Sequence, residues 1–384
     1  MTAASFISGK KKFQGKAAMV TIAVASFVII IAVAVSGGFR HELRKGISGI
    51  SGDIQITSPY MNYVGEDHPV TLSPGLESAI TALDGVDHIV PTIYRAGIVK
   101  AGTNIHGVIF KGIPGGGDSL RVSIPERLSA MLGMKQGDRM LTYFIGDKVK
   151  ARQFTVESVY EDILGSDDNL VIYAGIDDIR RINGWGPDKA SAIEVILEDS
   201  WRSADRMEYI TDEIGAEILF GQGTDSMVAT SAVRRYPQIF SWLDLIDFNV
   251  LIVLVLMVAV AGFNMISSLL IMLFRNISVI GTLKAMGMSD RAISSVFLRI
   301  ASSATLKGMA AGNILAFLFC IVQDATHFVK LDPANYFVSA VPVHLNALQI
   351  LGADLLAYIL IMLLLLLPCL FVSRVDPAKT VRVQ

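Results

Sequence analysis

Cysteine is nearly absent from this chain of 384 residues. The sequence contains only Cys320 and Cys369, and both lie in long apolar runs. The polar segment that precedes these runs, residues 38–247, has no cysteine and must fold without disulfide bonds. At about 200 residues, it is long enough to bury a hydrophobic core of its own.

An excess of one charge is also missing. The chain has 33 Lys and Arg residues against 35 Asp and Glu residues, which gives a formal net charge of −2. Because nucleic acid is usually bound by a strongly basic surface, this balance favours no nucleic acid partner. In contrast, 52% of the residues are hydrophobic and the mean hydropathy is +0.52, which indicates a membrane protein.

The sequence lacks the loop that binds phosphates in nucleotide-hydrolysing domains. That loop requires the spacing G-x-x-x-x-G-K-[ST], whereas residues 9–16 are one residue too long and continue into Ala17. Gly115-Gly116-Gly117 is interpreted as a flexible loop, since no helix opens directly after it. We therefore expect no nucleotide site in this chain.

Groups of metal ligands and catalytic side chains are missing as well. His41-Glu42 begins like a zinc-protease helix, yet Lys45 takes the place of the second imidazole. Asp167-Asp168-Asn169 lacks the spaced oxygens and the final Glu of a calcium loop, so it is read as a polar turn. Asp87-His88 has no Ser or Cys nucleophile motif beside it. The sequence predicts no metal site, no cofactor in this chain and no enzyme activity.

What the sequence has is four apolar runs, each near or above the roughly 20 residues that cross a bilayer. They are residues 17–37, 248–274, 294–322 and 350–372. The third run is the weakest because it contains Arg299 and Lys307, and we expect Lys307 to snorkel or to contact another helix. Asp354 lies near one end of the fourth run, where partial exposure would account for it.

A cleavable signal peptide is the alternative interpretation of the first run, because lysines precede it. The apolar core is too long for that, and the residues after it only loosely resemble a cleavage site. We therefore expect a retained helix. Residues 38–50 keep a helical repeat, so this helix is predicted to continue outward as a stalk.

The basic residues of the short segments indicate the orientation. Residues 1–16, 275–293 and 373–384 hold several lysines and arginines, whereas residues 323–349 hold Lys330 alone. By the positive-inside rule both termini are cytoplasmic. Basic residues also follow the first run, but they precede a long domain that would be translocated largely regardless of charge. Residues 38–247 and 323–349 are then outside the cytoplasm.

The outer segment, residues 38–247, is predicted to be an α+β domain inserted between the first two spans. Strands are expected at residues 53–57, 89–99, 105–110, 139–145, 154–160, 170–173 and 192–197, and helices at 74–83, 125–132, 177–182 and 203–219. The β-rich middle, about residues 102–186, is predicted to be one lobe inserted into a second lobe that the flanking helix and strand pairs form.

The cytoplasmic segment 275–293 carries an apolar stripe at steps of three and four residues. Its members are Val279, Ile280, Leu283 and Met286. This predicts a short amphipathic helix that ends at Gly287, with Ser289 capping the next helix. An apolar face in the cytosol favours docking into the groove of a partner protein. From periodicity alone, a helix that lies on the membrane surface is an equal alternative.

These residues resemble the permease subunits of lipoprotein-releasing ABC transporters (LolC/LolE type), within the wider MacB/FtsX-like permease group. The resemblance is carried by residues 260–269 at the end of the second span and by residues 280–289, followed by Ile293 and Phe297. Other similar stretches are residues 37–40, 84–86 with Pro91, 132–138, 336–338 with 341–343, and 376–378 with 381–382. The match at 336–343 favours the lipoprotein-releasing branch.

The resemblance implies a MacB-like periplasmic core domain in a protein of the bacterial inner membrane that works by mechanotransmission. A separate cytoplasmic ATPase dimer, which binds the ATP and Mg²⁺, would dock on the coupling helix, and a second permease subunit would pair with this chain as a homodimer or heterodimer. Lipoproteins would be extracted from the outer leaflet for delivery toward the outer membrane, with a periplasmic lipoprotein carrier as a further partner.

Two sets of residues follow from this resemblance. The coupling residues are Ile280, Thr282, Leu283, Lys284, Ala285, Met286, Gly287 and Ser289. The lining of a lipid cavity would include Phe39, Phe248 and Phe263, whose alternative role is ordinary helix packing. The family usually has an acidic residue where this chain has Val279, so an ion pair with the ATPase at that position is not expected.

Two other functions are alternatives. A MacB-type permease would drive efflux through an outer tunnel, although the sequence contains no fused ATPase domain. An FtsX-like signalling protein would control a cell-wall hydrolase, although its outer domain is usually smaller. A membrane-anchored scaffold that works without ATP is the third possibility.

Overall fold

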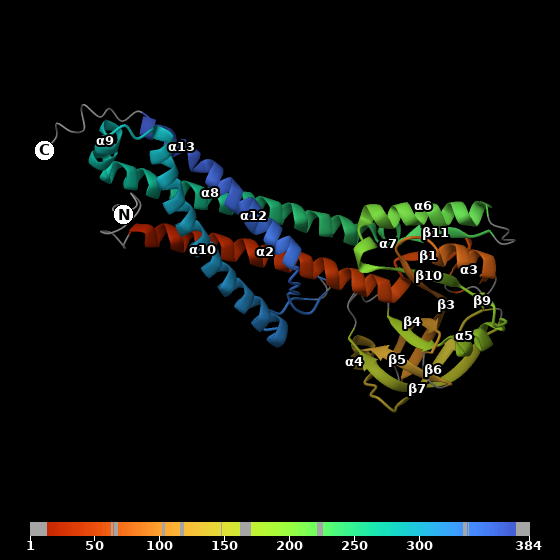
Figure 1. The fold of residues 1–384 in the computed structure, drawn as a ribbon. Coiled ribbons are helices and arrows are strands. Elements are labelled where there is room, and N and C mark those ends of the chain that lie inside the picture. The colour runs from red at the N-terminus through yellow and green to blue at the C-terminus, as the bar shows by residue number, and fades with distance from the viewer. Residues whose placement is uncertain are drawn as a thin grey trace. The chain divides into compact units, whose positions relative to one another are not determined.

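The computed structural model describes residues 14–373 except residues 63, 65–67, 102–103, 116–118, 147, 162–169, 221–225, 333–335 and 337. The predictions made for residues 1–12, for Asp167-Asp168-Asn169, for Gly116-Gly117 and for the tail from residue 374 lie outside the described residues. The chain divides into two compact units (Figure 1). Met1–Arg40, Trp242–Lys330 and Ala340–Gln384 form the span unit, and His41–Ser241 with Leu331–Ser339 form the sheet unit.

Four helices of the described chain are long and apolar enough to cross a membrane. They are α2 (Gln14–Ser51), α8 (Pro237–Arg275), α10 (Asp290–Thr326) and α12 (Ala347–Leu364), the last extended by α13 (Leu366–Ser373). The predicted continuation of the first span as a helix is confirmed, because α2 runs to Ser51. Helix α8 is longer than its apolar run, since it begins at Pro237, and proline suits a first helical position.

Helix α12 is interrupted at Leu365 by the local chemistry of the chain. Pro368 has no backbone N–H for the bond to residue 364, and its ring clashes with that carbonyl. Leu365 is nevertheless fully buried. The fourth span is therefore a helix with a defect near its end, and not a straight rod.

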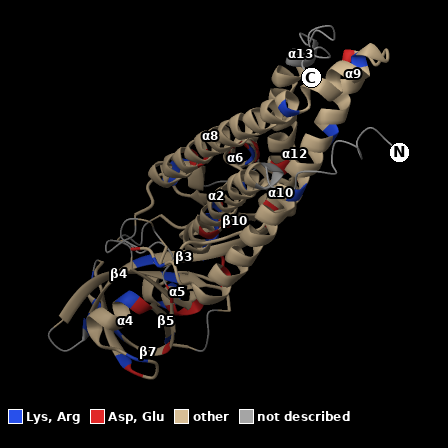
Figure 2. Ribbon diagram, turned by 90° about the vertical axis from the view of Figure 1, so that its left-hand side faces the viewer, with Lys and Arg blue, Asp and Glu red and all other residues tan. Residues whose placement is uncertain are grey.

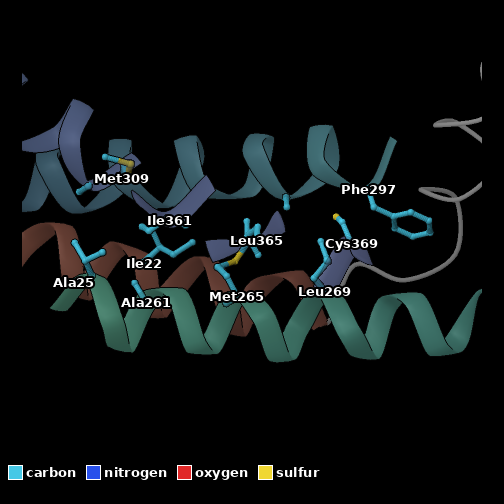
Figure 3. Close-up of a cluster of buried hydrophobic side chains, with 14 of the residues drawn as sticks. Ile22, Ala25, Ala261, Met265, Leu269, Phe297, Met309, Ile361, Leu365 and Cys369 are labelled. Atoms are coloured by element: carbon cyan, nitrogen blue, oxygen red, sulfur yellow. The ribbon is translucent and has the colours of Figure 1, made fainter. Parts of the chain in front are cut away.

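The span unit has a continuous apolar core, which Figure 3 shows in close-up. Ile22 and Ala25 of α2, Met265 of α8, Met309 of α10 and Ile361 of α12 all belong to it. Each helix thus contributes one face to a common cluster, and its other face is exposed. In a bilayer those outer faces would meet lipid or another protein.

The sheet unit contains a sheet of nine strands in the order β11-β1-β10-β3-β4-β8-β5-β7-β6. The strands are β1 (Ile54–Thr57), β3 (Val86–Ala101), β4 (Asn104–Ile113), β5 (Arg121–Pro125), β6 (Arg139–Phe144), β7 (Lys150–Tyr160), β8 (Val171–Gly175), β10 (Ala192–Leu197) and β11 (Val228–Ser231). The pair β2 (Val70–Thr71) and β9 (Lys189–Ala190) forms a separate ribbon.

Strand β3 joins two parts of this sheet. Its first half, residues 86–92, pairs with β10, and its second half, residues 93–101, pairs with β4. The second half also pairs with β6, so β3, β4, β8, β5, β7 and β6 close into a ring. Phe110, Phe144 and Phe154 fill the inside of that ring with edge-on and tilted contacts at 5.0 to 6.2 Å between centroids.

Helices cover the sheet and connect its strands. They are α3 (Pro74–Thr81), α4 (Glu126–Leu132), α5 (Ile176–Asn183), α6 (Ala204–Phe220) and α7 (Ala232–Arg235), with the 3-10 turn η1 (Asp199–Trp201). Charged residues are scattered over this unit and are sparse along α8 and α12 (Figure 2). The predicted strands and helices are found within a few residues. The short strands β2, β5, β9 and β11 were not predicted, because two to five residues carry too little pattern.

Candidate functional site

The segment between α8 and α10 folds as the predicted short helix, α9 (Ile277–Ala285). Its end is set by Gly287, which adopts a φ of +89°. The Gly287 N–H donates to the Lys284 carbonyl at 2.9 Å, and the Met288 N–H donates to the Leu283 carbonyl at 3.0 Å. These two bonds define a Schellman motif, which favours glycine at this position. The Ser289 hydroxyl then caps α10 by accepting from the Ala292 N–H at 3.4 Å.

The sequence predicted that the apolar stripe of α9 faces outward. In the structure, most of the stripe faces inward instead. Ile280 is buried in the core of the span unit, and Leu283 is half-buried against the same cluster. Met286 is the member of the stripe that is exposed, at 71% of its surface. The reason is that the core below this turn accepts an apolar side chain, so Ile280 is more stable inside than in water.

The outward surface of this segment is consequently small, and half of its residues are polar. It consists of Ser278, Thr282, Ala285, Met286, Gly287 and Ser289. Lys284 is held by an ion pair between its Nζ and the Asp290 Oδ1 at 2.8 Å, which ties α9 to the first turn of α10. We call the six exposed residues the α9 surface.

The three phenylalanines predicted to line a cavity lie in different surroundings. Phe39 is buried and makes an edge-on contact with Trp242 at 5.4 Å between ring centroids. Phe248 and Phe263 are exposed on α8. At 1.5 Å per residue, these two are about 22 Å apart along the helix, so they do not line one small site.

A junction forms where the Gly37-Gly38 pair of α2 meets the segment before α12. A Cβ on Gly38 would lie 2.3 Å from the Pro342 carbonyl oxygen, and the His344 N–H donates to the Ala34 carbonyl at 3.0 Å. Residues 37–40 and 341–343 are two of the separate stretches on which the family resemblance rests. The structure brings them into direct contact. Sequence reasoning did not predict this contact.

Two polar side chains reinforce the same junction. Asp247 of α8 accepts from the Ser36 hydroxyl at 2.6 Å and pairs with the Arg40 guanidinium. Gln323 of α10 is buried, and its amide donates to the Val341 carbonyl at 3.0 Å and accepts from the Val329 N–H at 3.1 Å. The bonds of Gln323 fix Val329 and Val341 against the end of α10, and those of Asp247 join α8 to α2.

Helix α10 approaches α2 through two glycines spaced four apart. A Cβ on Gly308 would lie 2.8 Å from the Met19 carbonyl oxygen, and one on Gly312 would lie 2.3 Å from the Ala23 carbonyl oxygen. Small residues at this spacing let two membrane helices pack backbone to backbone. The Gly-x-x-x-Gly pattern is visible in the sequence and was the signal that could have predicted this contact.

A polar chain crosses the span unit beside these glycines. The Ser26 hydroxyl donates to the Asn313 Oδ1 at 2.5 Å, and the Asn313 amide donates to the Asp354 Oδ2 at 2.6 Å. Ser26 and Asp354 also line a small apolar cavity with side chains of α2, α8, α10 and α12. Asp354 is thus tied to α10, while Lys307 is exposed on the surface of α10.

The described residues contain no group of three His, Cys, Asp or Glu side chains that could hold a metal ion. Asp87 and His88 contact each other at 2.9 Å, and both side chains are more than half exposed. Nothing in this geometry resembles a nucleophile with its base. The described residues instead offer three features, namely the α9 surface, the Gly38 junction and the close packing of α10 on α2.

Comparison with known proteins agrees with this description. Residues 251–377 match the family described as FtsX-like permease C-terminal. Two relatives from two strains of Xylella fastidiosa, both named lipoprotein-releasing system transmembrane protein LolC, are 21% and 20% identical over 407 aligned residues. Each match covers 98% of this chain and 95% of the relative.

Two solved structures are similar to part of the chain. The extracellular domain of the ABC-type transporter YknZ from Gram-positive bacteria is 14% identical, with a TM-score of 0.30, and covers 46% of this chain and 99% of its own. The periplasmic region of MacB from Actinobacillus actinomycetemcomitans is 14% identical, with a TM-score of 0.31, and covers 49% of this chain and 92% of its own.

The sequence motifs, the four apolar helices and the relatives point to the same resemblance. The match to LolC-named proteins extends over nearly the whole chain, and the match to the permease family begins within α8, at residue 251, and includes α13. The resemblance indicated by the motifs is therefore confirmed: residues 251–377 match the FtsX-like permease C-terminal family, and nearly the whole chain is similar to proteins named LolC.

Proposed function

We propose that this chain is the membrane subunit of an ABC transporter that extracts lipoproteins from the outer leaflet of the inner membrane, for delivery toward the outer membrane. The observation that carries the proposal is the similarity to two lipoprotein-releasing LolC proteins over 98% of the chain. ATP would be hydrolysed by a separate subunit, since the sequence contains no phosphate-binding loop.

The physical task explains why ATP is needed. Each CH₂ group of an acyl chain contributes about 0.8 kcal/mol to membrane anchoring, so a lipoprotein with several chains does not leave the bilayer unaided. Apolar faces that could receive those chains are present on α8, where Phe248, Leu251 and Val255 are exposed. In our proposal a second permease subunit faces this surface and closes a lipid path.

The orientation can be tested with single cysteines, because Cys320 and Cys369 are both buried. We expect Ser78→Cys on α3 to react with a membrane-impermeant maleimide when only the outer membrane is opened. Ser289→Cys should react only after the inner membrane is lysed. Both residues are exposed, so each is a control for the other. The reverse pattern would place the α9 surface outside the cytoplasm and contradict the proposal.

The α9 surface is proposed as the contact for the ATPase. Met286→Asp should lower co-purification of the cognate ATPase by about tenfold, because it puts a charge on the exposed apolar side chain of this surface. Protein yield and thermal stability should not change, since Met286 is 71% exposed. Quantitative co-purification in detergent would measure the effect.

Two other variants separate docking from folding. Leu219→Asp on α6 makes the same change at an exposed apolar residue of the sheet unit, and it should leave co-purification unaltered. Ile280→Asp buries a charge in the core of the span unit and should destabilise the whole chain. Normal ATPase binding by Met286→Asp would exclude this surface as the docking site.

The decisive experiment is reconstitution of the full complex with its ATPase in vesicles that carry a triacylated protein. We expect release of that protein only with hydrolysable ATP. Efflux of a soluble peptide without lipoprotein release would favour the MacB-type alternative. Activation of a cell-wall hydrolase by the complex, again without release, would favour the FtsX-like alternative.

A further inference from the structure

The carbonyl end of helix α2 lies inside the sheet unit. The helix ends at Ser51, and Gly52 follows with a φ of +70° and donates its N–H to the Ser48 carbonyl at 2.9 Å. The last carbonyls of a helix have no partner within the helix itself. In α2 the carbonyls of Gly49 and Ile50 face side chains from three strands, as the next contacts show.

Those side chains are one lysine and two tyrosines. The Lys111 Nζ on β4 donates to the Gly49 carbonyl at 2.8 Å and to the Ile50 carbonyl at 3.0 Å. The Tyr94 hydroxyl on β3 donates to the Ile50 carbonyl at 2.7 Å, and the Tyr173 hydroxyl on β8 donates to the Gly49 carbonyl at 3.2 Å. A cation at the negative end of the helix dipole adds to these bonds.

A buried carboxylate on β10 completes the group. The Glu194 Oε2 accepts from the Lys111 Nζ at 2.8 Å, and its Oε1 accepts from the Thr92 hydroxyl at 3.3 Å. The Tyr94 hydroxyl also lies against Oε1, so its single hydrogen is shared between Glu194 and the Ile50 carbonyl. The side chains of Lys111 and Glu194 are only 3% and 4% exposed. Gly52 is required beside them, because its Cβ would lie 2.8 Å from the Glu194 Cβ.

The buried ion pair of Lys111 and Glu194 is not explained by its contribution to folding stability alone. Burial raises the pKa of Glu194 and lowers the pKa of Lys111, and their mutual attraction opposes both effects. Well-packed apolar residues of the same volume often stabilise a protein equally well. The charged group instead orients the helix, since its directional hydrogen bonds define the position and rotation of the helix end.

The helix that is held here is also the first membrane span. Helix α2 has 38 residues, is unbroken from Gln14 to Ser51 and contains no proline. A rotation or axial shift of the span therefore reaches Gly49 and Ile50. Directly beyond them, β1 enters the sheet and pairs with β10, the strand that carries Glu194.

We propose that Lys111, Tyr94 and Glu194 are positioning residues for transport, which fix the carbonyl end of α2 to the sheet so that movement of the span moves the sheet unit. This inference rests on the proposed function and adds the residues of its mechanical joint, which we call the α2 joint. Loss of the joint should uncouple ATP hydrolysis from release.

The test uses the complete complex with its ATPase in vesicles. The variant Lys111→Met/Glu194→Leu removes both charges together, which avoids leaving one of them buried alone. We expect normal assembly and an ATPase rate near that of the unmodified complex. Lipoprotein released per ATP should fall by about tenfold, the size of a typical coupling between distant sites.

A second readout does not depend on the cargo. An environment-sensitive dye is attached to Tyr209→Cys on α6 or to Ile145→Cys after β6, both exposed positions of the sheet unit. In the otherwise unmodified complex, ATP should shift the dye signal. In Lys111→Met/Glu194→Leu that shift should be lost while hydrolysis continues, which an effect on stability alone would not produce.

Two tyrosine variants give a matched control. Tyr94→Phe removes the hydroxyl that bonds to the Ile50 carbonyl, and should lower the ATP-dependent dye shift and the release per ATP together. Tyr160→Phe removes a hydroxyl that bonds to the Val171 carbonyl within the sheet, and should change neither. If the double variant fails to fold, Tyr94→Phe alone still decides the question.

The outcomes separate the two proposals. A dye shift in the unmodified complex without lipoprotein release would overturn the proposed cargo and leave the α2 joint supported, provided that the variants abolish the shift. Folded variants that keep both the shift and the release per ATP would overturn the joint. A complex that hydrolyses ATP with no shift at either dye position would also overturn it.

Discussion

Gly38→Ala is expected to abolish the proposed lipoprotein release by the reconstituted complex. A Cβ at this position would lie 2.3 Å from the Pro342 oxygen, 2.5 Å from its carbonyl carbon and 2.8 Å from the Val343 nitrogen. All three are backbone atoms, so no side-chain rotation relieves the overlap. The segment 341–344 must move away from α2, which breaks the bond between the His344 N–H and the Ala34 carbonyl.

The size of the effect follows from the stiffness of this junction. Overpacking costs about 1 to 3 kcal/mol in ordinary cores, and a contact with fixed backbone falls at or above the upper end. The junction also includes the bonds from Gln323 to Val341 and from Ser36 to Asp247, which hold the surrounding segments in place. Release per ATP and the melting temperature of the purified complex would measure the loss.

Gly49→Ala is the matched stability control in the same helix, since it leaves in place the backbone carbonyl that Lys111 and Tyr173 contact. Its Cβ would have no neighbour within 4 Å. Since alanine is favoured over glycine in a helix by about 1 kcal/mol, this variant should be at least as stable as the natural protein. Equal behaviour of the two variants would show that the Gly38 junction does not constrain the protein.

Gly312→Leu is expected to have the second largest effect, because it separates α10 from α2. A Cβ at Gly312 would lie 2.3 Å from the Ala23 oxygen and 2.9 Å from the Ser26 Cβ, and a leucine adds three more carbons in the same space. In a bilayer this close packing is itself the main attraction between helices. The bond from Ser26 to Asn313 should be lost with it.

The measurement is the amount and thermal stability of folded protein extracted from membranes. Gly352→Leu on α12 is the control, since no atom lies within 4 Å of the Cβ that this position would carry. We expect a normal yield from Gly352→Leu and little or no folded complex from Gly312→Leu. Full stability of Gly312→Leu would mean that the two helices are not in contact in the membrane.

The sequence by itself determined the features that depend on neighbouring residues. Four candidate spans follow from the length of the apolar runs, because about 20 apolar residues in a helix suffice to cross the hydrocarbon core. The end of α9 at Gly287 and the cap of α10 at Ser289 follow from local hydrogen bonds. Most strands and helices of the sheet unit were predicted from periodicity for the same reason.

Only the tertiary structure decided which surfaces meet. The periodicity of residues 277–285 identified an apolar stripe on α9. It did not show that Ile280 would be buried in the core while Met286 stays exposed. Likewise, Lys111 and Glu194 are 83 residues apart, and nothing near either of them indicates that they join at the end of α2. Contacts of this kind arise when the whole chain packs, because the free energy of each depends on every neighbour at once.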